Sequence, residues 1–206
     1  MSRVAEISRR TKETDITIKL NLDGSGIADI YYPVGFMTHL LNTFSKHGLF
    51  DIELKAEGDI EVDQHHLIED TGIVLGQCFA KALGEKRGIY RVGSCLFPMD
   101  ETLARVAVDI SGRSYLVFNG DISGIPMISA SPRDIVSSFQ TDTVEDFWQA
   151  FTSAAGMAMH IDILKGRSDH HKIEAIFKAA ARSLRSAVEV DVRSSDLIPS
   201  TKGVLV

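Results

Sequence analysis

The sequence contains one five-residue pattern twice, and this repetition narrows the possible folds more than any other feature. The pattern is His-His-x-x-Glu, at residues 65–69 and again at residues 170–174. Each copy opens a run of apolar residues at three- and four-residue spacing, which is typical of an amphipathic helix. Two copies of one motif, each opening a helix, indicate an internal duplication. We expect a single domain over residues 1–206, built from two similar halves at about 1–89 and 90–206.

The predicted elements follow the same order in both halves, namely strands, a helix, a strand and a helix. In the first half, strands 15–21 and 27–32 are predicted to form a hairpin around Gly24-Ser25-Gly26, followed by helix 35–47 with Gly48 as its cap, strand 50–56 and helix 65–83. In the second half, strands are predicted near 90–98, 103–110 and 114–118, then helix 144–157, strand 160–164 and helix 170–188. Residues 120–138 and 192–202 are expected to be loops. Because an open sheet needs helices to cover its apolar face, the fold class is α+β with two fused halves.

Composition and charge limit the classes of partner. Hydrophobic residues make up 44% of the chain and charged residues 24%, as in an ordinary globular protein. The net charge of −6 gives no general attraction for nucleic acid or an anionic membrane, so a small-molecule partner is expected. With no signal peptide and no long apolar stretch, a cytoplasmic protein without a membrane span is predicted. Cys78 and Cys95 are interpreted as buried free thiols.

The residue types of the two motifs indicate metal binding. Residues four apart share one face of a helix, so His65 and Glu69 converge on one ion while His66 points elsewhere. The second motif repeats this geometry, and His39 and His160 each precede one histidine pair. Six imidazoles and two carboxylates divide into two sites with three imidazoles and one carboxylate each. Such a set suits Mn, Fe, Zn or Ni. The alternative is that these are surface histidines at helix starts with no ion.

Further stretches of the sequence, together with the two motifs, resemble the imidazoleglycerol-phosphate dehydratase family. They lie at residues 10–14, 39–41, 47–48, 63–70, 98–101, 109–113, 170–179 and 199–203, and the resemblance extends over nearly the whole chain. It implies a carbon-oxygen lyase (hydro-lyase) of histidine biosynthesis that dehydrates imidazole glycerol phosphate to imidazole acetol phosphate. It also implies a four-stranded sheet and two helices in each half, with the helices packed between the sheets. The resemblance further implies a 24-subunit homo-oligomer whose active sites are shared between subunits.

The resemblance also implies site residues. It implies two manganese ions per active site, with ligands His39, His65, His66, Glu69, His160, His170, His171 and Glu174. It implies substrate contacts from Glu13, His39, Arg91, Arg113, Lys178, Ser200 and Lys202. Arginine, lysine and hydroxyl donors are what a phosphate monoester requires. Glu13 is the candidate acid/base group, with metal-bound water and Glu174 as competitors.

The predicted mechanism follows from the weak acidity of the proton on the carbon that bears the imidazole ring. Two ions bound to the ring nitrogens would hold the substrate as an imidazolate and act as Lewis acids. Loss of the proton and then of hydroxide would pass through a diazafulvene-like intermediate.

Three features depart from the family pattern. Thr38 precedes His39 where an acidic or amide residue is usual, Gln140 replaces a common Asp, and the loop 120–138 is longer. Two alternative functions use the same motifs. A dinuclear metallohydrolase would need no special C-terminal tail, and a metal-storing shell would leave Arg91, Arg113 and Lys178 without a role.

Overall fold

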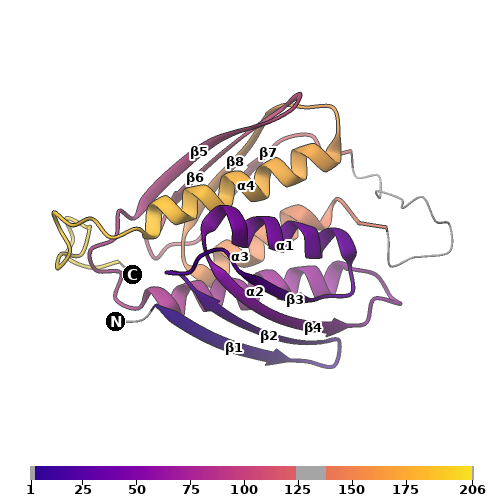
Figure 1. Cartoon of the computed structure of the whole chain (residues 1–206), viewed down its shortest axis with the longest axis horizontal. Helices are drawn as coiled ribbons and strands as arrows, with labels where there is room; N and C mark the ends of the chain where they lie inside the picture. Colours follow the sequence, from indigo (N-terminus) through magenta and orange to yellow (C-terminus); the bar gives the residue numbers. More distant parts are fainter. Residues whose placement is uncertain (1–2, 124–137, 206) are drawn as a thin grey trace.

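Two similar four-stranded sheets enclose four helices, so the predicted fold class is confirmed (Figure 1). The computed structural model describes residues 3–123 and 138–205. The first sheet has the order β1 (Val4–Arg10), β2 (Thr14–Asn21), β4 (Asp51–Gly58), β3 (Ala28–Tyr31). The second has the order β5 (Val92–Met99), β6 (Thr102–Asp109), β8 (Ala158–Lys165), β7 (Tyr115–Asn119). In both sheets the last two strands are parallel and the other neighbours antiparallel, so the two halves share one topology.

The four helices interlock the two halves. They are α1 (Gly35–Gly48), α2 (His65–Leu83), α3 (Thr143–Ala155) and α4 (Asp169–Val188). Helix α1 of the first half packs against α4 of the second, and α2 packs against α3. Alternate residues of the inner strands are fully buried beneath them, as with Ile16, Ile18 and Leu20 of β2. The functional groups on these helices therefore meet partners from the opposite half.

The predicted hairpin of residues 15–21 and 27–32 is wrong. β2 and β3 are not neighbours, because β4 lies between them and pairs antiparallel with β2 and parallel with β3. The connection is instead tied to the start of β4, where Asp51 accepts hydrogen bonds from the backbone N–H groups of Ser25 and Ile27 at 2.8 and 3.0 Å. A glycine-rich turn between two strands thus suggested a pairing that the sheet does not use.

Other local predictions need small corrections. Strand β1 was not predicted, although it forms an edge of the first sheet. The left-handed residue that ends α1 is Leu49, with φ 54°, and not Gly48, where a Cβ would lie 2.3 Å from the ring of Phe50. Cys78 is buried but Cys95 is only half-buried, and both thiols are free. Most of the predicted loop 120–138 lies outside the described residues, and residues 192–202 contain neither helix nor strand. No helix among the described residues is long and apolar enough to cross a membrane.

Candidate metal centre

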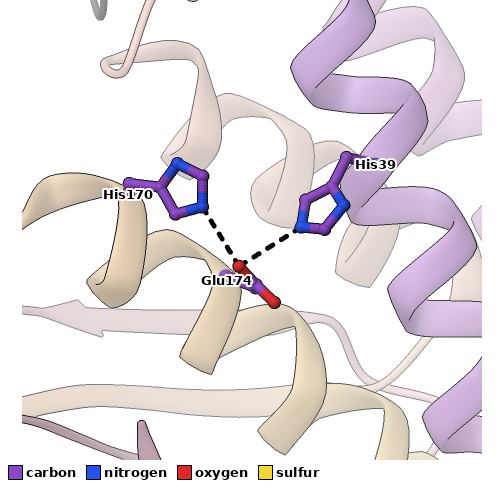
Figure 2. A group of neighbouring side chains, drawn as sticks. All are labelled: His39, His170 and Glu174. Atoms are coloured by element: carbon purple, nitrogen blue, oxygen red, sulfur yellow. Dashed lines mark hydrogen bonds and ion pairs between the residues drawn. The ribbon is translucent and has the colours of Figure 1, made fainter. Parts of the chain in front are cut away.

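Three side chains of the predicted ligand set meet between α1 and α4. His39 Nε2 and His170 Nε2 each lie 3.2 Å from the same oxygen, Glu174 Oε2 (Figure 2). Within residues 3–123 and 138–205 this is the one group in which three such ligand atoms lie within 4.8 Å of one another. An ion with ligands at roughly 2.0–2.2 Å separates neighbouring ligand atoms by roughly 3 Å. Two imidazoles and a carboxylate at these distances therefore fit a divalent transition metal.

The helix geometry explains why these three residues converge. His170 lies in the first turn of α4, which Ser168 caps by accepting a hydrogen bond from the backbone N–H of His171. Glu174 follows one turn later and therefore lies on the same face as His170. His39 reaches this face from α1, so the cluster combines one half's helix with the other half's motif.

Glu174 is buried, and its two oxygens have different partners. Oε1 forms an ion pair with Lys178 Nζ at 2.8 Å, while Oε2 faces the two imidazoles. Burial favours the neutral acid, but the hydrogen bonds from Lys178 and His39 outweigh this effect and lower the pKa of Glu174. The group therefore remains a carboxylate, the form that binds metal.

A second group lies between α2 and α3. His65 Nε2 lies 3.8 Å from Glu69 Oε2, and His65 Nδ1 lies 3.5 Å from Asp146 Oδ2. Helix α3 is the counterpart of α1 in the duplicated topology, so Asp146 faces the first motif as His39 faces the second. The two halves thus differ chemically, with a carboxylate where the other half has an imidazole. Sequence reasoning did not single out Asp146.

The second histidine of each pair points away from the first, as the helical geometry predicted. The rings of His65 and His66 have centroids 6.2 Å apart at 80°, and those of His170 and His171 are 5.9 Å apart at 84°. His66 Nδ1 instead lies 3.1 Å from Asp59, and His171 Nδ1 lies 2.8 Å from Glu101. The hydrogen bond to His171 lowers the pKa of Glu101 to about 2.

His160 occupies a different face of the molecule. It is exposed on β8, between Ala107 of β6 and Val117 of β7, while its neighbours Met159 and Ile161 are buried beneath the helices. Because side chains alternate along a strand, His160 points to the outer face of the second sheet. The chain by itself does not bring His160 to either histidine cluster.

Glu13 lies close to the first motif although the two are far apart in sequence. It belongs to the exposed turn between β1 and β2, where its carbonyl oxygen accepts a hydrogen bond from the backbone N–H of Asp59 at 3.0 Å. The hydrogen bond with Asp59 raises the pKa of His66, and the charge of Glu13 adds to this shift. The acid/base candidate therefore stands beside one of the paired histidines.

Most of the predicted phosphate-binding residues line a separate hollow. Its polar lining consists of Arg91, Ser111, Arg113, Ser200, Thr201 and Lys202. Arg91 holds the tail in place, because its guanidinium donates to Asp109 at 2.7 and 3.0 Å and to the carbonyl of Pro199 at 2.9 Å. Lys178 does not line this hollow and instead pairs with Glu174.

The two substituted positions of the site are accommodated locally. Thr38 donates its hydroxyl to the carbonyl of Val34, the residue that precedes α1, at 3.2 Å. Gln140 forms a reciprocal pair with Gln64, in which each side-chain oxygen accepts the other residue's backbone N–H at 2.8 and 3.2 Å. Gln140 thereby joins the start of α2 to the segment before α3.

Comparison with known proteins identifies the family. The sequence profile of the family described as imidazoleglycerol-phosphate dehydratase matches residues 33–184. The chain belongs to this family. The dehydratase of Methylorubrum populi is 50% identical over 203 residues, which is 98% of this chain and 100% of that protein. The dehydratase of Lacticaseibacillus casei is also 50% identical over 203 residues, with the same coverage of both chains.

Solved dehydratase structures have the same fold. The Staphylococcus aureus enzyme superposes with a TM-score of 0.78 at 37% identity, covering 91% of this chain and 99% of its own. The Pyrococcus furiosus enzyme, solved in complex with (S)-C348, gives a TM-score of 0.79 at 30% identity, covering 97% and 100%. The chain is therefore a metal-dependent hydro-lyase of histidine biosynthesis, an imidazoleglycerol-phosphate dehydratase. This result decides against the metallohydrolase and storage-shell alternatives.

Proposed function

We propose that the dehydration takes place at a two-manganese site assembled between copies of the chain in a 24-subunit shell in the cytoplasm. The main support is the separation of two groups of residues along α4. His170 begins this helix, whereas Arg91 of the phosphate hollow donates its backbone N–H to Ala187 near the helix end. At 1.5 Å per residue these positions are roughly 25 Å apart. The three-carbon chain of the substrate has bonds of only roughly 1.5 Å, so one chain's hollow serves another chain's metal cluster.

The proposed ligands of the first ion include His39, His170 and Glu174, and those of the second include His65 and Glu69. His66 and His171 point away from the ion of their own motif and are available to ions centred elsewhere. When bound, the two ions supply Lewis-acid stabilisation of negative charge on the imidazole ring. The predicted ligand role of His160 would require a neighbouring chain, because His160 lies on the outer face of its sheet.

The substrate phosphate is proposed to bind in the hollow lined by Arg113, Ser200 and Lys202. Two cations and a hydroxyl give charge-assisted hydrogen bonds to phosphate oxygens. Arg91 contributes by fixing the tail through Pro199, and its pKa is raised by the hydrogen bonds from its guanidinium to Asp109. Lys178, next to Glu174, would meet the substrate from the metal side of the site.

Glu13 is the better candidate for proton transfer than Glu174. Both oxygens of Glu174 already have partners, namely Lys178 on one side and the imidazoles on the other. The side chain of Glu13 is exposed at the rim of the first motif and is free to approach a substrate.

Subunit complementation tests the shared site. Arg113→Ala damages the phosphate hollow and His170→Ala damages the first metal cluster, so each homomeric variant is expected to lose nearly all dehydration of imidazole glycerol phosphate. After the two variants are dissociated, mixed equally and reassembled with Mn²⁺, some sites combine an intact cluster with an intact hollow. Activity should return to at most about a quarter of wild type, as random pairing of two contributing subunits predicts.

The matched control mixes Arg113→Ala with Lys202→Ala, two variants of the same hollow. Here every hollow is damaged, so activity should stay at the level of the single variants. Failure of the first mixture to regain activity, when reassembled wild type is fully active, would mean that each chain carries a complete site.

A further inference from the structure

Two carboxylates outside the two motifs make matching contacts with matching histidines. Asp59 lies 3.1 Å from Nδ1 of His66, and Glu101 lies 2.8 Å from Nδ1 of His171. His66 and His171 are each the second histidine of a pair. The same ring nitrogen is engaged in both halves, and Nε2 is left as the other nitrogen of each ring.

The contacts are not a simple consequence of the duplication. Asp59 follows β4, whereas Glu101 lies in the turn between β5 and β6, so the two acids come from different positions in the repeated topology. Two unrelated backbone segments thus supply the same chemical group to the same ring atom.

Glu101 is held firmly by its surroundings. Besides His171, it accepts hydrogen bonds from the backbone N–H groups of Ser168 and Arg167 at 3.1 and 3.4 Å. Ser168 is the capping residue of α4, so Glu101 is tied to the same helix start that carries His171. The carboxylate therefore has a defined orientation towards the imidazole ring.

We propose that Asp59 and Glu101 are positioning residues that hold the Nδ1–H of His66 and His171, so that Nε2 of each ring is presented to a metal ion. A neutral imidazole carries one proton, and an acceptor at Nδ1 keeps that proton there and leaves the lone pair on Nε2. A carboxylate acceptor also increases the basicity of the ligand nitrogen. This inference rests on the proposed function, in which both histidines are metal ligands.

The consequence is that metal affinity depends on residues that do not touch the metal. Loss of such a partner typically weakens binding by roughly 10- to 100-fold. Because the two acids act on different histidines, a double variant should show the losses of both single variants.

The test measures Mn²⁺ binding to chelated, full-length protein by equilibrium dialysis, with the melting temperature of the metal-free protein alongside. Glu101→Ala and Asp59→Ala should each weaken binding at one class of site by about 10- to 100-fold. Glu101→Gln should fall between wild type and Glu101→Ala, since its amide oxygen still accepts from Nδ1 but carries no charge. Asp100→Asn, an exposed neighbour with a left-handed backbone that Asn tolerates, and Glu61→Gln should bind Mn²⁺ like wild type.

The ordering of the variants separates a positioning role from a structural one. If the acids only stabilise the fold, the metal-free melting temperature will fall while the Mn²⁺ affinity of the folded variants stays at the wild-type value, which overturns the inference. His171→Ala is measured in parallel. If it weakens Mn²⁺ binding and Glu101→Ala does not, the inference alone fails. Unchanged binding by His171→Ala would refute both the inference and the proposed ligand role of His171.

Discussion

At the scale of single residues, carboxylates organise this protein by accepting several hydrogen bonds each. Glu174 joins two imidazoles and a lysine from two helices. Asp51 joins the connection before β3 to the start of β4, through the backbone N–H groups of Ser25 and Ile27. In both cases the charge is held by donors rather than by an isolated ion pair, and donors of this kind stabilise the ionised form.

Asp51 leads to a prediction about pH. Burial raises its pKa, but the hydrogen bonds from Ile27 and Ser25 outweigh burial, so the pKa lies below its ordinary value. Its stabilising effect is therefore complete above the ordinary carboxyl pKa of about 3.9 and is lost as the pH falls through the lower folded-state value. Asp51→Asn should be about 1 kcal/mol less stable than wild type at pH 7, and the difference should shrink as the pH falls below the ordinary carboxyl pKa of about 3.9.

Urea unfolding of both proteins between pH 7 and pH 2.5 measures this difference. Glu57→Gln, on the exposed face of the same strand, is the control and should match wild type throughout. A stability difference for Asp51→Asn that did not change with pH would show that the carboxylate charge is not its source.

At the scale of elements, the close approach of α2 and α3 depends on glycines. A Cβ on Gly76 would lie 2.5 Å from the carbonyl oxygen of Phe151 and 2.9 Å from the Cβ of Ala154. Backbone atoms cannot move aside without moving the helix. Because α2 carries His65 and α3 carries Asp146, this packing also sets the geometry of the second cluster.

We predict that Gly76→Ala destabilises the protein by about 1–3 kcal/mol, since overpacking outweighs the better helix propensity of alanine. Mn²⁺ affinity at the second cluster, between α2 and α3, should fall in the same variant. Gly35→Ala is the matched control, because no atom lies within 4 Å of the added Cβ, and it should change stability by less than about 0.5 kcal/mol. Thermal melting measures the change in stability, and Mn²⁺ titration measures the change in affinity. If Gly76→Ala and wild type had the same melting temperature, α2 and α3 would accommodate the added methyl group without loss of stability, and the prediction would be wrong.

At the scale of the whole molecule, the interlocked helices place one cluster between α1 and α4 and the other between α2 and α3. If each ion also takes a histidine from a neighbouring chain, the metal stabilises both the fold and the assembly. An ion that binds only the native state and is present at a free concentration of 100 times its Kd adds about 2.7 kcal/mol per site to the free energy of unfolding.

Removal of metal should therefore lower the melting temperature and dissociate the assembly into smaller species. Differential scanning calorimetry and sedimentation velocity compare the purified, chelated and Mn²⁺-reloaded protein. Reloading should restore both properties. Identical melting and sedimentation before and after chelation would contradict a bridging role for the metal.

Much of the fold was predictable because it is repeated and local. The helices that begin with the two histidine pairs, the strands of the second half and the shared element order all follow from periodicity and turn residues. The divergence of His65 and His66 was predictable for the same reason, since adjacent residues of a helix point in different directions. The pairing of β3 with β4 was not predictable. Turn residues between β2 and β3 do not show whether these strands pair directly or whether another strand lies between them in the sheet.

The sequence by itself determined the duplication, the family, the two motifs and which side chains share a helix face, because these depend on neighbours within a few residues of one another. Only the tertiary structure decided that His39 meets Glu174 of the other half and that Asp146 stands opposite His65. The same holds for the contacts of Asp59 and Glu101 with the second histidine of each pair. It also separated the proposed phosphate hollow from the cluster of His39, His170 and Glu174 along α4. Such contacts join residues far apart in the chain, and they depend on how two sheets and four helices pack to bury their apolar faces.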